Sequence, residues 1–415
     1  MAITPPTHLL KGKIRLPGSK SITNRALLIA SLADGHSILS GALKSDDTIV
    51  MANALRLMGV KIDKLEQPII NIYATATLLE ANQVLLLGNA GTATRFLTAA
   101  AGLVNGKTII DGDEDMRKRP IEPLVKSLNS IGVNCFATNG CPPVTIQSNG
   151  KISGKSIEID ASLSSQYVSA LLIIAPMLGH EFTISFGAKE KIGGRGYIDL
   201  TLAIMREFGA IVDEVEPNKW VVQATGYKAI NYNIAPDFSS CTYLWAIKAL
   251  MGAELELYPL MGIKNQPDAK AQEFIKPFPN MPTTIDGEQM QDAIPTLAVL
   301  AAFNSQTIRF TGIANLRVKE CDRIAALNKG LNAISKGLAK EDGDDLIIFG
   351  NPNLISPKQP VLINTYNDHR IAMSFALAGL KLENILIDNP NCVAKTYAKF
   401  WDDLADIGVK LDLID

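Results

Sequence analysis

Residues 89–102 read NAGTATRFLTAAAG, a polar start followed by a run of small and apolar residues. Five further segments have this form: SKSITNRALLIA (19–30), SSQYVSALLIIAP (164–176), DFSSCTYLWAIKA (237–249), DAIPTLAVLAAF (292–303) and NDHRIAMSFALAG (367–379). Side-chain oxygens at a polar start can cap the free N–H groups of a helix, and a helix that is apolar on all sides is buried. The sequence therefore predicts six repeated units, each with one buried helix.

A second element recurs between these segments, an amphipathic helix pattern that ends in glycine and is followed by a β-branched strand. Examples are NALRLMGVKI (53–62), SLNSIGVNC (127–135), IMREFGAIV (204–212) and DLADIGVKL (403–411). Glycine after the last turn is a common helix stop. Short segments such as TIIDG (108–112) and TIRFTG (307–312) supply further strands. We therefore predict an α/β protein of two domains with three units each, divided within residues 229–236.

The composition is that of a globular protein with large cores. The 415 residues are 47% hydrophobic and 20% charged, with a net charge of −2. This balance disfavours a general nucleic-acid binder, and the longest apolar stretch, 167–178, is too short to cross a bilayer. Five cysteines without a CxxC pair, together with an N-terminus that lacks a leader pattern, predict a cytoplasmic protein. The four scattered histidines make a metal site improbable.

The polar starts carry more cationic and amide side chains than capping requires. Helix N-termini attract phosphates and carboxylates, so these side chains favour an anion-binding site. Two more basic clusters are RKRP (117–120), where Pro120 is expected to open a helix, and NLRVKECDR (315–323). A solvated surface network remains an alternative for both clusters. The candidates in the starts are Lys20, Ser21, Arg25, Asn89, Thr92, Arg95, Ser164, Ser165, Gln166, His369 and Arg370.

No nucleotide-binding fingerprint occurs in the sequence. GNAGTATR (88–95) is neither a Walker A motif nor a GxGxxG motif, and GGRG (193–196) follows no strand pattern. Asp292 begins a buried segment, where it is either a helix cap or a general base. His369 is flanked by Asp368 and Arg370, which favours a functional role over a structural one.

Together these segments resemble the 5-enolpyruvylshikimate-3-phosphate synthase family. The resemblance implies an inside-out α/β barrel fold in two domains, each with three βαβαββ repeats around buried parallel helices. The implied domains are residues 19–235 and residues 1–18 with 236–415, with hinge crossings near 16–19 and 229–236. The matching segments are PGSKSITNRALLIASLADG (17–35), SDD (45–47), LGNAGTATRF (87–96), MRKRPIEPLV (116–125), SSQYVSALL (164–172), DFSS (237–240), DA (292–293), NLRVKECDRI (315–324), YNDHRIAM (366–373) and AKT (394–396).

The resemblance also implies a reaction. The enolpyruvyl group of phosphoenolpyruvate moves to the 5-hydroxyl of shikimate 3-phosphate, and phosphate leaves, by addition and elimination without a metal or organic cofactor. Lys20, Asp292 and Glu320 are the implied catalytic residues, and we expect Asp292 to take the hydroxyl proton and Glu320 to protonate the methylene carbon. Besides the two substrates, glyphosate is an expected inhibitor. We expect a monomer that binds neither nucleic acid nor membrane.

Binding residues follow from the same resemblance, and arginine forks and lysine charges suit these anionic substrates. For shikimate 3-phosphate the residues are Lys20, Ser21, Arg25, Ser164, Ser165, Gln166, Tyr197, Asp292, Asn315 and Lys319. For phosphoenolpyruvate they are Lys20, Asn89, Gly91, Thr92, Arg119, Gln166, Arg323, His369, Arg370 and Lys395, with Lys319 shared. Family members with glycine at the position of Gly91 are often inhibited by glyphosate, so we expect Gly91→Ala to give resistance.

Three positions depart from the family pattern. Gly194 stands where the family usually has a serine that touches the 3-phosphate, and Arg195 or a backbone N–H is a candidate replacement. Phe96 stands where many members have proline, and Leu316 replaces a common tryptophan. These changes are expected to alter packing beside the site and to remove none of the proton carriers.

Two rival functions fit parts of the pattern. UDP-N-acetylglucosamine enolpyruvyl transferase shares the fold and the donor, but its usual cysteine-bearing loop would fall near 111–123, which contains no cysteine. A non-catalytic protein that binds phosphorylated metabolites would also have cationic helix starts. The presence of Lys20, Asp292 and Glu320 argues against that reading.

Overall fold

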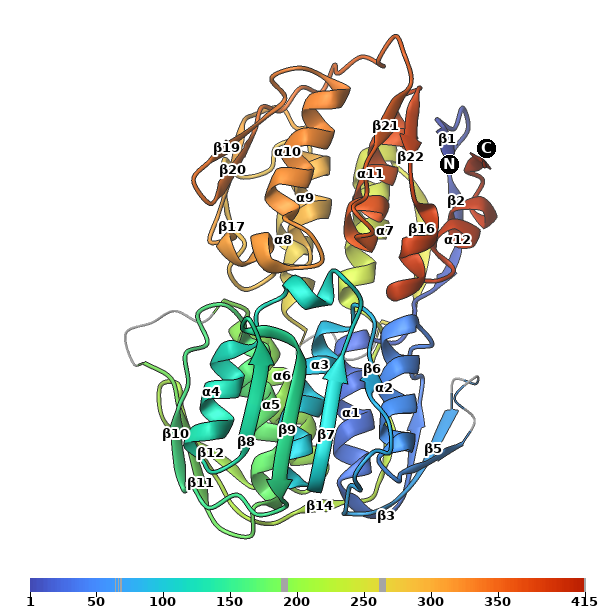
Figure 1. Ribbon diagram of the computed structural model, residues 1–415. Helices are drawn as coiled ribbons and strands as arrows, with labels where there is room; N and C mark the ends of the chain where they lie inside the picture. The colour runs from blue at the N-terminus through green and yellow to red at the C-terminus, as the bar shows by residue number, and fades with distance from the viewer. Residues whose placement is uncertain (64, 66, 68, 188–192, 261–265, 414–415) are drawn as a thin grey trace. The chain divides into compact units, whose positions relative to one another are not determined.

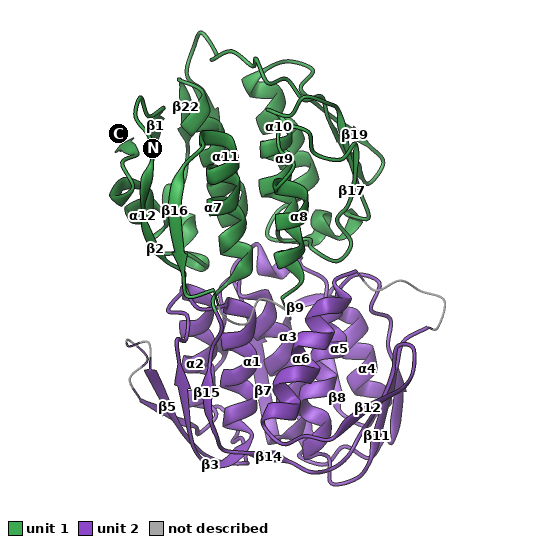
Figure 2. Cartoon of the chain, turned by 180° about the vertical axis from the view of Figure 1, so that it is seen from behind, with its two compact units in different colours: residues 1–17, 236–415 green, residues 18–235 purple. Residues whose placement is uncertain are grey.

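The computed structural model describes residues 1–63, 65, 67, 69–187, 193–260 and 266–413. The chain folds into two compact units: unit 1 is residues 1–17 with 236–415, and unit 2 is residues 18–235 (Figure 2). Backbone pairing places the N-terminal residues in unit 1. Strand β1 (Ala2–Thr4) lies antiparallel to β23 (Lys410–Asp412), and β2 (Lys11–Arg15) lies parallel to β16 (Glu254–Tyr258).

Unit 2 is built around three buried helices, which are α1 (Lys20–Ser31), α3 (Gly91–Ala100) and α5 (Ser165–Ile174). Every residue of α3 is buried, because its small side chains let neighbouring elements approach on all sides. Three amphipathic helices bury one face each; they are α2 (Asp46–Leu57), α4 (Glu122–Ser130) and α6 (Arg195–Glu207). The predicted helices of this half of the chain are confirmed, except for the helix start predicted at Pro120.

Three sheets enclose the helices of unit 2 (Figure 1). Each has a path of one parallel and two antiparallel pairs, so the same pairing pattern occurs three times, and the first sheet has a second short parallel pair. The first sheet contains β3 (Ala33–Ser40), β5 (Ile69–Thr75), β4 (Lys61–Asp63), β14 (Tyr227–Lys228) and β15 (Asn231–Asn233). The second sheet runs β6 (Leu85–Leu86), β7 (Asn105–Asp111), β9 (Cys141–Asn149), β8 (Asn134–Thr138). The third sheet runs β10 (Ser156–Glu158), β11 (Phe182–Ser185), β13 (Lys219–Val222), β12 (Val212–Glu216).

Unit 1 repeats this plan with less regular parts. Its buried helices are α7 (Phe238–Met251), α9 (Ile294–Ala301) and α11 (His369–Lys381), and its other helices are α8 (Ala271–Ile275), α10 (Arg323–Ile334) and α12 (Phe400–Asp406). Helix α8 is short because Pro267 and Pro277 lie on either side of it. Two sheets repeat the pairing pattern of unit 2. One runs β17 (Thr284–Asp286), β18 (Ile308–Thr311), β20 (Asp345–Ile348), β19 (Ala339–Asp342). The other runs β21 (Val361–Ile363), β22 (Ile385–Ile387), β1, β23.

The starts of the six buried helices fall into two groups. Ser19, Ser164, Asp237 and Asp368 each accept a hydrogen bond from a backbone N–H of the following helix, which is the predicted capping. Helices α3 and α9 instead have alanine at the N-cap, so Asn89 and Asp292 do not cap them. Their side chains are left for other contacts.

One local prediction is wrong. Pro120 does not open a helix, because α4 begins only at Glu122, and Pro123 occupies its first turn. Arg119 is extended after a short 3-10 turn, η2 (Met116–Lys118). In the ranges that the structure covers, no helix has the length and apolar character needed to span a membrane.

Candidate functional site

Unit 2 holds a buried arginine where four helices meet. Arg25 of α1 is 2% exposed. Its Nε donates to Thr201 Oγ1 at 2.7 Å, its Nη1 to the Ser21 carbonyl at 2.9 Å, and its Nη2 to the Tyr197 carbonyl at 3.2 Å. A longer bond of 3.5 Å joins Nη2 to Ser169 Oγ. All these partners are neutral, so the guanidinium charge remains available to an anion.

The surroundings of Arg25 change its protonation. Burial lowers the pKa of Arg25 to about 10, although contact with Tyr197 opposes the change. The side chain therefore stays charged near neutral pH, and an anion beside it would recover part of the lost solvation. The guanidinium carbon also lies 5.2 Å from the centre of the Phe96 ring on α3.

Lys20, the first residue of α1, forms an ion pair within unit 2, and both side chains of the pair are largely shielded from solvent. Its Nζ lies 3.2 Å from Asp47 Oδ2, and Asp47 belongs to the first turn of α2. A capping box formed by Ser45 and Thr48 fixes this turn. Asp47 was not predicted as a site residue, although the SDD segment 45–47 was a usable signal.

The loop before α3 brings predicted donor-binding residues together. Arg119 Nη1 donates to Asn89 Oδ1 at 2.8 Å, and Gln166 Nε2 donates to Thr92 Oγ1 at 3.3 Å. Gly91 faces two guanidinium groups, since a Cβ built on it would lie 2.8 Å from Arg119 Nη2 and 2.9 Å from Arg95 Nη1.

Ser165 and Tyr197 lie beside Gly194, the position where the family usually has serine. A Cβ on Gly194 would be 3.3 Å from Ser165 Oγ and 3.2 Å from Tyr197 Cδ2, and the backbone φ is +74°. Arg195 is not a ready replacement, because it donates to Asp199, Glu214 and Asn218. Its guanidinium also lies 5.0 Å from the ring centre of Trp220.

Unit 1 holds a second buried arginine, with a different set of partners. Arg323, the first residue of α10, is 1% exposed. Its Nε donates to Asp368 at 2.7 Å, its Nη1 to Asp292 at 2.9 Å, and its Nη2 to Glu320 at 2.8 Å. Burial lowers the pKa of Arg323, but the three carboxylates raise it by more, so the net pKa is above its ordinary value.

Asp292 bridges two arginines of unit 1. Its second oxygen accepts from Arg370 Nη2 at 2.7 Å, and Arg370 Nη1 donates to Tyr243 Oη at 3.3 Å. Since the N-cap of α9 is Ala293, Asp292 does not cap this helix, and its role as a general base stays a prediction. Burial keeps the pKa of Tyr243 above its ordinary value although Arg370 opposes this, so the phenol stays protonated. Tyr243 of α7 was missed, since it lies inside an apolar run.

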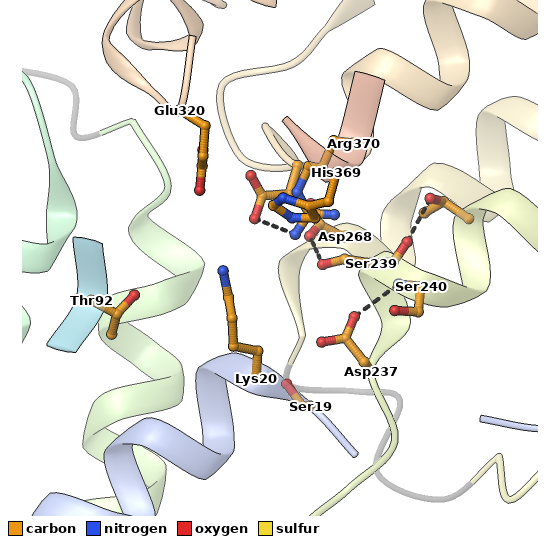
Figure 3. Close-up of polar contacts among 12 residues, drawn as sticks. Ser19, Lys20, Thr92, Asp237, Ser239, Ser240, Asp268, Glu320, His369 and Arg370 are labelled. Carbon is orange, nitrogen blue, oxygen red and sulfur yellow. Dashed lines mark hydrogen bonds and ion pairs between the residues drawn. The ribbon is translucent and has the colours of Figure 1, made fainter. Parts of the chain in front are cut away.

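The first turn of α11 supplies the other groups of this cluster. Asp368 Oδ1 accepts from the Arg370 backbone N–H at 2.8 Å, and the fully buried His369 has Nδ1 3.6 Å from the same carboxylate. Figure 3 shows His369 and Arg370 together at this helix start. Lys395 Nζ, at the end of the 3-10 helix η7 (Pro390–Lys395), lies 3.7 Å from Glu320 Oε1.

The two basic clusters of the sequence divide between site and surface. Arg317 pairs with Asp322, Glu341 and Asp344 in a partly exposed network. Arg117 and Lys118 pair with Asp111 and Asp115, whereas Arg119 and Arg323 are buried. The surface alternative therefore fits Arg317, Arg117 and Lys118, and it does not fit the buried Arg119 and Arg323. Asn315, in η6 (Ala314–Val318), has a buried Oδ1, with the buried Leu316 next to it and Lys319 following.

The cysteines of this chain form no disulfide bond. All five cysteines are free thiols, and burial raises the pKa of Cys135 to about 12. Over the residues that the structure describes, no group of three or more His, Cys, Asp or Glu side chains could hold a metal ion.

A family model described as EPSP synthase (3-phosphoshikimate 1-carboxyvinyltransferase) matches residues 4–404. The chain belongs to the EPSP synthase family. It is 54% identical over 409 residues to a protein of Rhizobium leguminosarum bv. trifolii, covering 99% of this chain and 97% of that protein. It is 55% identical over 411 residues to one of Pseudomonas syringae pv. syringae, covering 99% and 98%. Both relatives are named 3-phosphoshikimate 1-carboxyvinyltransferase.

Solved structures show the same fold for this EPSP synthase family member. EPSP synthase from Acinetobacter baumannii aligns with a TM-score of 0.79 at 24% identity, covering 99% of each chain. The enolpyruvyl transferase NikO from Streptomyces tendae aligns with a TM-score of 0.76 at 16% identity, covering 98% of this chain and 97% of NikO. At these identities the likeness concerns the fold alone, and it confirms a mixed α/β protein of two domains.

Proposed function

We propose that this chain transfers the enolpyruvyl group of phosphoenolpyruvate to the 5-hydroxyl of shikimate 3-phosphate and releases phosphate. The family match over residues 4–404 supports the reaction class. Within the structure, the observation that carries the proposal is the Arg323 cluster, in which one buried guanidinium holds both Asp292 and Glu320. Two carboxylates beside cations suit a reaction that must move protons and bind anions.

In unit 2 we assign the acceptor's anionic groups to Ser21, Arg25, Ser164, Ser165, Gln166 and Tyr197. Arg25 has only neutral hydrogen-bond partners among the described residues, which suits a bound carboxylate or phosphate. The donor's groups are assigned to Asn89, Gly91, Thr92, Gln166 and Arg119. Lys20, steadied by Asp47, is assigned to both substrates as a charge and a proton carrier.

In unit 1 we assign donor binding to Arg323, His369, Arg370 and Lys395, and acceptor contacts to Asp292, Asn315 and Lys319. If the donor carboxylate binds the Arg370 guanidinium, it replaces Asp292 there, and one oxygen of Asp292 loses its arginine partner. Asp292 then takes the hydroxyl proton as the acceptor oxygen attacks the donor's C2, and Glu320 protonates the methylene carbon. Glu320 enters this step as the carboxylic acid and leaves it as the carboxylate. The carboxylate then takes back one methyl proton as the C2–O bond to phosphate breaks and the C=C bond forms again, and the proton held by Asp292 leaves with the phosphate.

Glyphosate is a further proposed ligand of the donor residues. A methyl group at position 91 would press on Arg119 and Arg95, because its Cβ would fall within 3.0 Å of both guanidinium groups. We expect Gly91→Ala to raise the glyphosate concentration for half inhibition, and the KM for phosphoenolpyruvate, by about tenfold or more. Dose–response curves on both proteins test this, and superimposable curves would refute the steric argument.

The finer architecture is also a proposal. We propose an inside-out α/β barrel of three βαβαββ repeats per unit, with hinges near 16–19 and 229–236, in a monomeric cytoplasmic enzyme. The pairing pattern that recurs in five of the described sheets supports the repeats. Small-angle scattering should show a smaller radius of gyration when shikimate 3-phosphate is added, and an unchanged radius would contradict the hinges.

The deciding experiment is phosphate release from phosphoenolpyruvate with two alternative acceptors. We expect release with shikimate 3-phosphate and none with UDP-N-acetylglucosamine. Release with the second acceptor alone would transfer the assignment to the sister reaction. Tight binding of shikimate 3-phosphate without any release would identify a non-catalytic binding protein.

A further inference from the structure

Phe96 contributes an aromatic face to the buried arginine of unit 2. The Phe96 side chain is fully buried in α3, and its ring centre lies 5.2 Å from Arg25 Cζ. The face of an aromatic ring is electron-rich, so a guanidinium within about 6 Å of it is attracted, most strongly where water is excluded. Both side chains belong to unit 2, and neither is solvent-exposed.

Arg25 has few other ways to offset its charge. Its hydrogen bonds run from the edge of the guanidinium to two hydroxyls and two backbone carbonyls. They use the Nε proton, one proton of Nη1 and both of Nη2, which leaves one Nη1 proton without a partner in the described part of the chain. The planar group is therefore fixed by neutral groups at its edge and by the Phe96 ring.

We propose that Phe96 is a positioning residue for the anion-binding Arg25, acting through a cation–π contact. The inference rests on the proposed function, because Arg25 is assigned there to the acceptor. The ring holds the guanidinium in place, so that its remaining N–H can bind the acceptor's anionic group. Unlike a carboxylate, the ring does not compete with that group for the N–H. An aliphatic side chain could fill much of the same space but could not attract the charge.

The first test compares two phenylalanine-to-leucine variants of unit 2. Phe96→Leu should raise the KM for shikimate 3-phosphate about threefold to tenfold, with kcat and the KM for phosphoenolpyruvate within about twofold. Phe208→Leu is the matched control. Phe208 is equally buried, but its ring packs against an aromatic ring, with its centre 5.4 Å from the ring centre of Tyr232. Equal acceptor KM values in the two variants would overturn the proposal.

A fluorinated series separates the cation–π contact from packing. Fluorine withdraws electron density from the ring with little change in size, so site-specific mono-, di- and trifluorophenylalanine at position 96 should raise the acceptor KM stepwise. A flat series would reduce Phe96 to a packing residue. If the wild-type enzyme released no phosphate, the proposed function would fail instead. The Arg25 Hε resonance would then decide the contact, because an upfield ring-current shift must disappear in Phe96→Leu.

Discussion

Arg25 and Arg323 are both almost fully buried, yet the two units surround them in opposite ways. Arg25 in unit 2 has hydroxyls, backbone carbonyls and an aromatic ring, and burial lowers its pKa to about 10. Arg323 in unit 1 has three carboxylates that outweigh the effect of burial and raise its pKa. Under the proposed assignment, unit 2 keeps a charge for an incoming anion, whereas unit 1 keeps acids in place.

The difference explains how a buried arginine can serve either of two tasks. A cation with neutral partners binds, because the ligand supplies its counter-charge. A cation that already holds carboxylates positions them for proton transfer, and it can exchange one of them for a substrate carboxylate. Asp292, shared by Arg323 and Arg370, is the carboxylate best placed for such an exchange within unit 1.

The largest expected effect is on the acids of unit 1. We expect Asp292→Asn and Glu320→Gln to lower kcat by roughly 10²–10⁴-fold, with small changes in either KM, because proton transfer is lost while shape is kept. Steady-state phosphate release measures this. Asp322→Asn is the control, since Asp322 caps α10 and pairs with the partly exposed Arg317. Near wild-type turnover in either acid variant would remove that residue from the proton path.

The next effect contrasts the stability of the two arginine sites. Arg323→Gln leaves Asp292, Glu320 and Asp368 without the cation that joins them, so the free energy of unfolding should fall by about 3–5 kcal/mol. Urea unfolding followed by circular dichroism measures the loss.

Arg25→Gln is the paired variant, and we expect its unfolding free energy to stay within about 1 kcal/mol of the wild type. The folded-state pKa lies below the ordinary value of an arginine, so the unfolded chain binds the proton more tightly and the charge costs stability below about pH 10. Removing it offsets the lost hydrogen bonds. The KM for shikimate 3-phosphate should nevertheless rise about 10–100-fold. Equal stability losses in the two variants would contradict the comparison.

Much of the fold could be predicted because its signals are local. The six polar starts and the glycine-terminated helices depend on capping and periodicity, which a single sequence shows directly. Pro120 was misplaced because the proline that enters the helix is Pro123, three residues later. A sequence pattern places a helix end only to within a few residues, because tertiary contacts determine where the helix begins.

The site was predicted less completely, for a physical reason. Arginines and acids in the helix starts were visible, but what each one touches depends on residues far away in sequence. Thr201 contacts Arg25 across 176 residues, and Tyr243 contacts Arg370 across 127. A threonine in a helix and a tyrosine in an apolar run carry no local mark of such a contact. The aromatic contact of Phe96 was hidden for the same reason.

The smallest expected effect concerns Gly194, next to the neutral groups of unit 2. Gly194→Ser should cost about 1 kcal/mol of stability, because φ of +74° is unfavourable for a side chain. It should also raise the KM for shikimate 3-phosphate a few-fold, since the new Cβ would crowd Ser165 and Tyr197. Thermal unfolding and steady-state kinetics measure the two effects.

Gly179→Ser supplies the control for backbone strain alone. Gly179 has a φ of +75°, and nothing lies within 4 Å of a Cβ built there. The two variants should therefore lose similar stability, and only Gly194→Ser should change the acceptor KM. A lower KM in Gly194→Ser would show that the added hydroxyl binds the acceptor and that Ser165 yields to make room. Unit 2 would then bind its anion through one more neutral group, a hydroxyl at position 194, where the wild-type chain has only glycine.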